Sequence, residues 1–265
     1  MNNYTQSSSK DLEEKWQQKS FFEGKYSIKQ RTTSKLQNQF MSFYDSRLIS
    51  IVLKIIGKTS VDSVLDVGCG CGTDAFHISK YAQNVLGIDI SLTALKEGNS
   101  LSSGGNKAKT SFMLSDTEYI PIKSNQFDLV LCKDLLHHVP SPILTLKEMK
   151  RVTKVGGHVV AIEANGYNPQ MVTIGLIHYS VDKGVFKSTA ERLSNLFLKA
   201  QISEVAVNRT EYLPRAFLFE YRSPLSRFNS DFATMCLSKI EDALDQSSII
   251  EKFANYLVIH GIKKN

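Results

Sequence analysis

Two features of this sequence could do chemistry: a glycine-rich turn that follows an acid, and a pair of adjacent histidines. Residues 64–72 read Val-Leu-Asp-Val-Gly-Cys-Gly-Cys-Gly, so an apolar segment with an acid near its end runs into three alternating glycines. Glycine lets the backbone turn sharply and lets a ligand approach the main chain closely. A strand, a glycine loop and a helix in succession are typical of a nucleotide-type ligand at the carboxyl end of the strand.

The acid in front of the glycines, Asp66, indicates what kind of ligand the loop would bind. A dinucleotide fingerprint reads G-x-G-x-x-G and cradles a pyrophosphate, whereas the spacing here is Gly68-x-Gly70-x-Gly72. A carboxylate repels a pyrophosphate but favours an ammonium group. S-adenosylmethionine has an ammonium, a sulfonium and a carboxylate, so it suits this loop better. A tight turn without any ligand is the alternative, which the matches further along the chain disfavour.

Two more acids follow predicted strands and fit the remaining parts of such a ligand. Asp89 could accept hydrogen bonds from both hydroxyls of a ribose, with Ile90 against the adenine face. Its alternative role is to cap the next helix, for which Ser91 is better placed. The carboxylate of Asp116 could accept from the adenine amine while the main-chain N–H of Thr117 meets a ring nitrogen. Taken alone, Asp116 is equally well explained as an ordinary turn acid.

The adjacent histidines, His137 and His138, lie in the loop after the fourth predicted strand, which should face the bound cofactor. A neutral histidine near the methyl group could deprotonate an acceptor hydroxyl or amine, so both are candidate catalytic bases. The alternative is that one of them merely packs under the loop. Two adjacent histidines are not a metal pair by spacing alone, and no cysteine or acid cluster supports one. We therefore predict no metal site.

Strands and helices alternate around these motifs, and this predicts a parallel, doubly wound α/β sheet. The predicted strands are 63–67, 84–89, 110–114, 127–132, 158–164, 205–210 and 256–262. The predicted helices are 39–56, 73–81, 92–100, 143–152 (closed by Gly156 and Gly157), 170–179 and one that a capping box at 188–191 opens. Residues 214–253 are predicted to be mostly helical.

Composition excludes several classes of protein. The chain has 265 residues, a net charge of +6 and no run of 18 or more apolar residues, so we expect no membrane span. Residues 1–10 lack an apolar signal region, which leads us to expect a cytoplasmic location. Basic residues are scattered, and the densest patch, 147–154, has no aromatic platform, which disfavours a nucleic-acid partner. The four cysteines lack zinc spacing and are expected to be reduced.

With these motifs in order, the chain resembles the class I S-adenosylmethionine-dependent methyltransferases, in the small type 11 family. The resemblance covers about residues 60–165. It rests on the motifs at 64–72, 87–89 (Gly-Ile-Asp), 127–130 (Phe-Asp-Leu-Val), 136–139 (Leu-His-His-Val) and 148–157 (Glu-Met-Lys-Arg-Val-Thr-Lys-Val-Gly-Gly). It implies a Rossmann-like methyltransferase fold: a doubly wound, mostly parallel seven-stranded sheet whose last strand is antiparallel, with helical cover elements.

The resemblance also implies where the cofactor would lie. The methionine moiety is placed by Asp66 and the glycine loop, the ribose by Asp89, and the adenine near Ile90, Asp116 and Thr117. Lys133 would contact the cofactor near its sulfonium end, where the family commonly has a smaller residue. The implied cofactor-binding residues are Asp66, Gly68, Cys69, Gly70, Gly72, Asp89, Ile90, Asp116, Thr117 and Lys133.

We expect a polar, partly disordered N-terminal segment over 1–35 and a methyltransferase domain over 36–265. Its cofactor-binding core would be about 60–165, with acceptor-side cover elements at about 165–187 and 214–252. The expected reaction moves a methyl group from S-adenosylmethionine to an O, N or C atom of a small or medium-sized molecule, leaving S-adenosylhomocysteine, in a monomer or homodimer. A non-catalytic S-adenosylmethionine-binding protein, an RNA methyltransferase and an NAD-dependent oxidoreductase are the alternatives.

Overall fold

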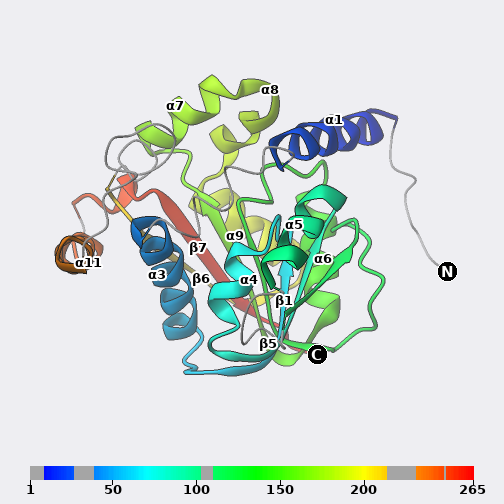
Figure 1. Ribbon diagram of the computed structural model, residues 1–265, viewed down its shortest axis with the longest axis horizontal. Helices are drawn as coiled ribbons and strands as arrows, with labels where there is room; N and C mark the ends of the chain where they lie inside the picture. The colour runs from blue at the N-terminus through cyan, green and yellow to red at the C-terminus, as the bar shows by residue number, and fades with distance from the viewer. Residues whose placement is uncertain (1–8, 27–38, 103–109, 214–230, 248) are drawn as a thin grey trace.

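The computed structural model describes residues 9–26, 39–102, 110–213, 231–247 and 249–265, and its centre is one seven-stranded sheet (Figure 1). The strand order is β3-β2-β1-β4-β5-β7-β6, and β7 runs antiparallel to both of its neighbours while the other pairs are parallel. This confirms the predicted architecture. The strands are β1 Val61–Val67, β2 Ala82–Asp89, β3 Thr110–Leu114, β4 Phe127–Lys133, β5 Thr153–Ala164, β6 Ser203–Thr210 and β7 Tyr256–Ile262.

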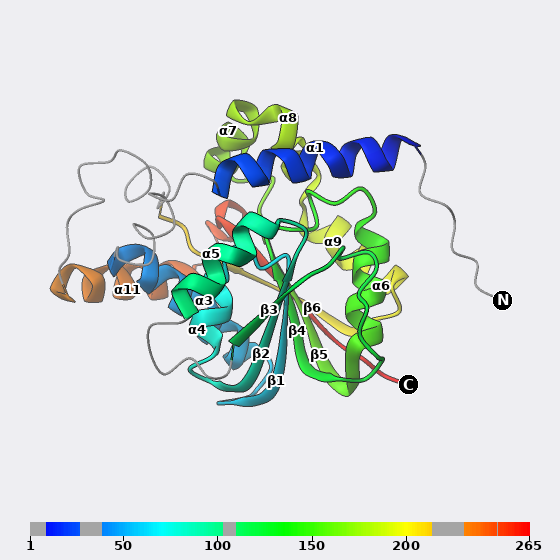
Figure 2. The ribbon, with the colours of Figure 1, turned by 45° about the vertical axis from the view of Figure 1, so that its right-hand side comes forward.

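Helices cover both faces of the sheet because its central strands are apolar on both sides. Successive residues of a strand point to opposite faces, so Val64 packs with α3 and α4 while Leu65 packs with α6 and α9. Figure 2 shows these two helical layers on either side of the sheet. The helices are α3 Gln39–Ile55, α4 Thr73–Ile78, α5 Leu92–Ser102, α6 Pro142–Val152, α7 Pro169–Ile177, α8 Tyr179–Asp182, α9 Ala190–Lys199 and α11 Asp231–Asp245, with 3-10 turns at Lys183–Lys187 and Glu251–Phe253.

Three predicted helix boundaries are wrong, and one of them is the end of the helix predicted over 73–81, since α4 ends at Ile78. The glycines Gly156 and Gly157 do not close α6, since α6 ends at Val152 and Thr153 already has the extended backbone of β5. The helix thus runs directly into a strand, and the glycines lie inside that strand. At α9, the side chain that caps the helix belongs to Thr189, which accepts a hydrogen bond from the N–H of Arg192, rather than to Ser188.

The N-terminal helix α1, Ser9–Tyr26, was not predicted, because this stretch has a polar sequence with little apolar periodicity. It lies beside α5 and α8 at the edge where the parallel strands end (Figures 1 and 2). Residues 1–8, 27–38 and most of the predicted helical insertion, 214–230, lie outside the described residues. Within the described part of the chain, no helix is long and apolar enough to cross a membrane. The cytoplasmic location stays a prediction.

Two histidines face each other across the antiparallel pair of β5 and β7. Nδ1 of His158 lies 2.9 Å from Nε2 of His260, so the two rings share one hydrogen bond. Burial and the neighbouring His158 lower the pKa of His260 to about 4, and burial also lowers the pKa of His158. Both rings are therefore neutral in the folded chain at neutral pH.

We predict that this pair makes the protein less stable as the pH falls from 6.5, the ordinary pKa of histidine, to about 4. In that window the unfolded chain binds a proton at His260 and the folded chain does not, so acid favours unfolding. Urea unfolding at several pH values should give a shallower loss of stability for His260→Gln than for the wild type. His178→Gln, a change outside the sheet, is the control, and equal pH dependence in wild type and His260→Gln would refute the assignment.

Candidate functional site

The glycine loop joins β1 to α4 at the carboxyl end of the sheet. Gly68, Gly70 and Gly72 have φ values of +73°, +54° and +81°, a left-handed backbone that favours glycine. A Cβ on Gly68 would also collide with the side chain of Leu135. The N–H groups of Gly68 and Cys69 both donate to the carbonyl of Ile88, at 2.8 and 3.0 Å, which ties the loop to β2. The three alternating glycines are therefore required by the backbone path.

Asp66 lies beneath this loop and is 2% exposed. Its Oδ2 is buried and has no hydrogen-bond partner among the described residues. Burial and the nearby charge of Asp74 raise the pKa of Asp66 well above its usual range, while the Lys133 ammonium opposes that shift. A buried carboxylate oxygen without a donor is costly, so this position fits a ligand that brings a cationic N–H group.

Lys133, at the end of β4, lies close to that acid. Its Nζ is 2.7 Å from Asp74 at the start of α4 and 3.1 Å from the buried Asp45 of α3. The lysine thus connects two helices to the sheet. One ammonium faces three carboxylates here, counting Asp66, so the cluster has an excess of negative charge that a cationic ligand would reduce.

Asp89, the last residue of β2, connects the glycine loop to α5. Its two carboxylate oxygens accept from the N–H groups of Gly70 and Ser91, each at 2.8 Å. Ser91 caps α5 through its hydroxyl, which accepts from the N–H of Ala94 at 3.1 Å, as the sequence predicts. Burial raises the pKa of Asp89, although these backbone hydrogen bonds favour its charged form. The N–H of Ile90 is a third backbone donor to Asp89. A carboxylate has about four acceptor sites, so capacity remains for a ligand hydroxyl.

Helix α1 contacts the same edge through two charged residues. Glu23 accepts from the N–H of Leu92, at the start of α5, at 2.9 Å. Lys15 lies 2.7 Å from both Asp116 and Glu118, which follow β3. Thr117, between them, is buried, and its hydroxyl lies 3.4 Å from that of Thr145 on α6. The carboxylate of Asp116, a predicted adenine contact, is thus already engaged by a lysine of α1.

The two histidines lie beside each other in the loop after β4, with ring centroids 4.0 Å apart. Nδ1 of His137 is 2.6 Å from Oε2 of Glu163, an acid at the end of β5 that is fully buried. Burial disfavours the charged form of His137, but the charge and hydrogen bond of Glu163 outweigh this effect, so the pKa of His137 is raised. Nε2 of His138 lies 3.4 Å from Asp182 of α8.

Glu163 also fixes the loop itself. Its Oε1 accepts from the N–H groups of Leu135 and Leu136, at 3.0 and 2.7 Å. A single buried carboxylate therefore sets both the backbone path before the histidines and the orientation of the His137 ring.

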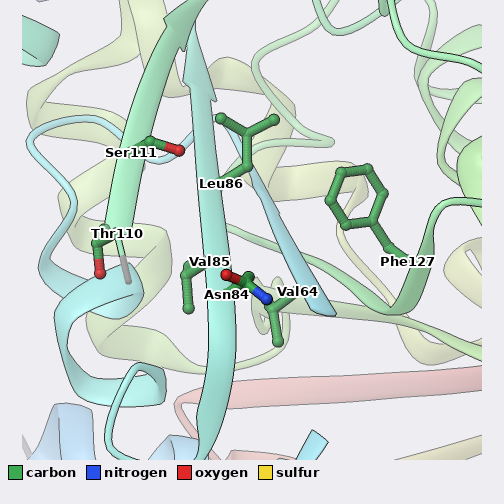
Figure 3. Close-up of a pocket in the computed structure, with 7 residues that line it drawn as sticks. All are labelled: Val64, Asn84, Val85, Leu86, Thr110, Ser111 and Phe127. Carbon is green, nitrogen blue, oxygen red and sulfur yellow. The ribbon is translucent and has the colours of Figure 1, made fainter. Parts of the chain in front are cut away.

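Two surface hollows lie away from this edge. One, of about 180 Å³, is formed by side chains of β1 to β4, among them Leu86, Ser111 and Phe127 (Figure 3). The other, of about 520 Å³, lies along α9 and includes Tyr167 and Arg192. Neither includes a residue of the glycine loop or a predicted site residue, and we assign them no function.

Comparison with known proteins identifies the family. Residues 65–161 match the model of a family described as a methyltransferase domain. An uncharacterized methyltransferase of Schizosaccharomyces pombe is 35% identical over 122 residues, which are 43% of this chain and 43% of that protein. Tocopherol O-methyltransferase of Arabidopsis thaliana is 31% identical over 124 residues, 44% of this chain and 36% of that protein. The chain spans about half or less of the length of the curated relatives it matches.

Solved structures agree on the fold. Phosphoethanolamine N-methyltransferase 2 of Haemonchus contortus, in complex with S-adenosyl-L-methionine, matches with a TM-score of 0.60 and 18% identity, over 83% of this chain and 53% of that one. Residues 65–161 of this chain therefore form a class I S-adenosylmethionine-dependent methyltransferase domain of the type 11 family. The resemblance read from the motifs is confirmed, as is the cofactor class of the family.

Within this methyltransferase domain, the structure brings several predicted residues to one edge, at the ends of β1, β2 and β4. These are Asp66, the glycine loop, Asp89 and Lys133. Cys69 lies in the loop, where burial and the charges of Asp66 and Asp89 raise the pKa of its thiol well above the ordinary value. This shift disfavours the thiolate, which is the nucleophilic form of cysteine. The individual ligand contacts stay predictions.

Sequence reasoning missed several charged groups at this edge. They are Lys15, Glu23, Asp45, Asp74, Glu163 and Asp182. Glu163 had a usable signal, since it is an acid near the end of a strand like Asp66 and Asp89. The partners on α1, α3 and α8 had none, because they approach from elements distant in sequence.

We predict that Lys133→Met lowers the free energy of unfolding by about 3 kcal/mol, because it leaves buried carboxylates without their counter-charge. The control is Lys154→Met, which removes a more exposed ion pair with Asp128 and should cost less than about 1 kcal/mol. Denaturant unfolding of both variants measures the difference. Similar small losses for both would mean that Lys133 does not compensate the acids around it.

Proposed function

We propose that this protein transfers a methyl group from S-adenosylmethionine to an O, N or C atom of a small or medium-sized molecule, leaving S-adenosylhomocysteine. The observation that carries the proposal is the buried, unpartnered Oδ2 of Asp66 beneath the glycine loop. This oxygen is a negatively charged acceptor, which would attract the ammonium group of an amino-acid moiety and repel a pyrophosphate. An NAD-dependent oxidoreductase is disfavoured for this reason.

The residues present fit the cofactor. Asp66 would accept from its ammonium group, the main chain at Gly68 and Gly70 would lie along its methionine moiety, and Asp89 would accept from its ribose hydroxyls. Ile90 would lie against the adenine. When bound, S-adenosylmethionine supplies a methyl group that its positively charged sulfur activates toward a nucleophile.

On the acceptor side, the histidine pair would handle the proton that the acceptor loses. Glu163 holds Nδ1 of His137 at 2.6 Å, so Nε2 is the nitrogen that would face an acceptor. Much of the rate would come from holding acceptor and methyl group in line, to which the rigid loop after β4 contributes. The relatives named above methylate oxygen in one case and nitrogen in another, so the acceptor atom is left to experiment.

We predict that Asp89→Asn weakens S-adenosylmethionine binding by about 10- to 100-fold, because hydrogen bonds to a charged group contribute about 1.5–3 kcal/mol. Calorimetric titration measures this affinity. Asp62→Asn, at an exposed position near the start of β1 where Asp62 accepts from the side chain of Gln83, should bind as the wild type does. Unchanged affinity in Asp89→Asn would refute the ribose assignment, and no binding by the wild type would refute the proposed function.

We further predict that His137→Ala lowers kcat by at least about 100-fold while S-adenosylmethionine affinity stays unchanged. The assay follows release of S-adenosylhomocysteine with a panel of small-molecule acceptors. His178→Ala, outside the site, serves as the control. Equal kcat in wild type and His137→Ala would contradict the role of this histidine, and binding without turnover on any acceptor would favour a non-catalytic protein. Salt-sensitive retention of RNA together with RNA methylation would favour the nucleic-acid alternative.

A further inference from the structure

The acceptor side of the site contains a group of side chains with the composition of a metal centre. His137 and His138 come from the loop after β4, and Asp182 comes from the end of α8. Each offers one ligand atom, and these three atoms lie within 4.8 Å of one another. From the sequence we predict no metal site, because the spacing of the two histidines is not that of a metal pair and no cysteine or acid cluster accompanies them. The fold supplies an acid from a distant helix.

The surroundings of His137 are those of a metal ligand. Its Nδ1 is held at 2.6 Å by the fully buried Glu163, which leaves Nε2 to coordinate an ion. Histidines that bind metals almost always donate their other N–H to such a carboxylate or to a carbonyl. Glu163 cannot turn away easily, because its other oxygen accepts from Leu135 and Leu136. The ring is thus fixed before any ligand arrives.

The second and third side chains are held close by packing. Nε2 of His138 is 3.4 Å from Oδ1 of Asp182, a separation that two ligands of one ion can have. The chain after Asp182 is pressed against the loop, since a Cβ on Gly184 would collide with the carbonyl oxygen of His137. The exposed fractions of the three side chains are 6%, 11% and 21%, so the group is shielded without being sealed.

We propose that His137, His138 and Asp182 bind a divalent first-row transition metal ion such as Zn²⁺, Co²⁺, Mn²⁺ or Fe²⁺. Two imidazoles and one carboxylate suit these ions, whereas Mg²⁺ and Ca²⁺ prefer oxygen ligands alone. Three protein ligands leave a coordination position open, as in catalytic centres. Its role rests on the proposed function. With an ion bound, the histidines would be its ligands rather than bases. The ion would hold a hydroxyl of the acceptor and make its proton acidic enough to pass to water before the oxygen takes the methyl group, which favours oxygen acceptors.

The test is Co²⁺ titration of the full chain without an affinity tag, followed by visible absorption and by calorimetry. We expect one ion per chain and a d–d absorption band. Asp182→Ala and His138→Ala should abolish one-to-one binding, and Glu163→Gln should weaken it about 10- to 100-fold by releasing the His137 ring. His178→Ala is the matched control and should bind as the wild type does. Circular dichroism and melting of each variant establish that it is folded.

The same samples are titrated with S-adenosylmethionine, so that the two proposals fail separately. No Co²⁺ binding by the folded wild type, or equal binding in Asp182→Ala, would overturn the metal site and leave His138 and Asp182 as a simple ion pair. Metal binding without S-adenosylmethionine binding would instead overturn the proposed function. Activity that a chelator abolishes and Co²⁺ restores, on hydroxyl acceptors only, would support the proposed role of the ion.

Discussion

Buried carboxylates at the ends of the parallel strands organise this domain. Asp66 is the second-last residue of β1, Asp89 is the last residue of β2, and Glu163 is the second-last residue of β5. An acid removed from water must be compensated by donors or cations. Asp89 and Glu163 obtain backbone N–H groups from the loops beside them, and in doing so they fix those loops. Among the described residues, Asp66 keeps one oxygen without a donor, which is the property we expect of a position that binds a ligand.

Buried carboxylates are compensated by different groups on the cofactor side and on the acceptor side of the proposed site. On the predicted cofactor side, Lys133 faces the carboxylates of Asp45, Asp66 and Asp74, so acids outnumber the lysine among the described contacts. That imbalance attracts a cation. On the acceptor side, the carboxylates face imidazoles: Glu163 faces His137 and Asp182 faces His138. Those pairs attract a proton or a metal ion instead. Charge would therefore separate the proposed cofactor position from the proposed acceptor position within one edge of the sheet.

Local features of the sequence were enough to predict the glycine loop, Asp89, the Ser91 cap and most strands, because short-range backbone rules determine them. The antiparallel last strand came only from the family resemblance. The partners Asp45, Glu23 and Asp182 could not be predicted, since their roles depend on how α3, α1 and α8 pack onto the sheet. The error at Gly156 has a similar cause: pairing with β4 and β7 draws Thr153 into a strand directly after α6.

Asp116 has two possible roles, as an adenine contact and as an ordinary turn acid, and the contacts of its carboxylate favour the second. Its Oδ1 accepts from the N–H of Glu118 at 2.9 Å, the bond of an ordinary turn acid, and its Oδ2 is 2.7 Å from Lys15 on α1. An adenine amine would have to share Oδ2 with a charged lysine, whereas ribose hydroxyls at Asp89 would share its oxygens with backbone N–H groups. Lys15 of α1 pairs with Asp116, and Glu23 of α1 accepts from Leu92 at the start of α5. An adenine amine at Asp116 would therefore compete with the lysine that holds α1 in place. Asp89 is therefore the stronger candidate contact, and Asp116 is better explained as the acid that holds the N-terminal helix.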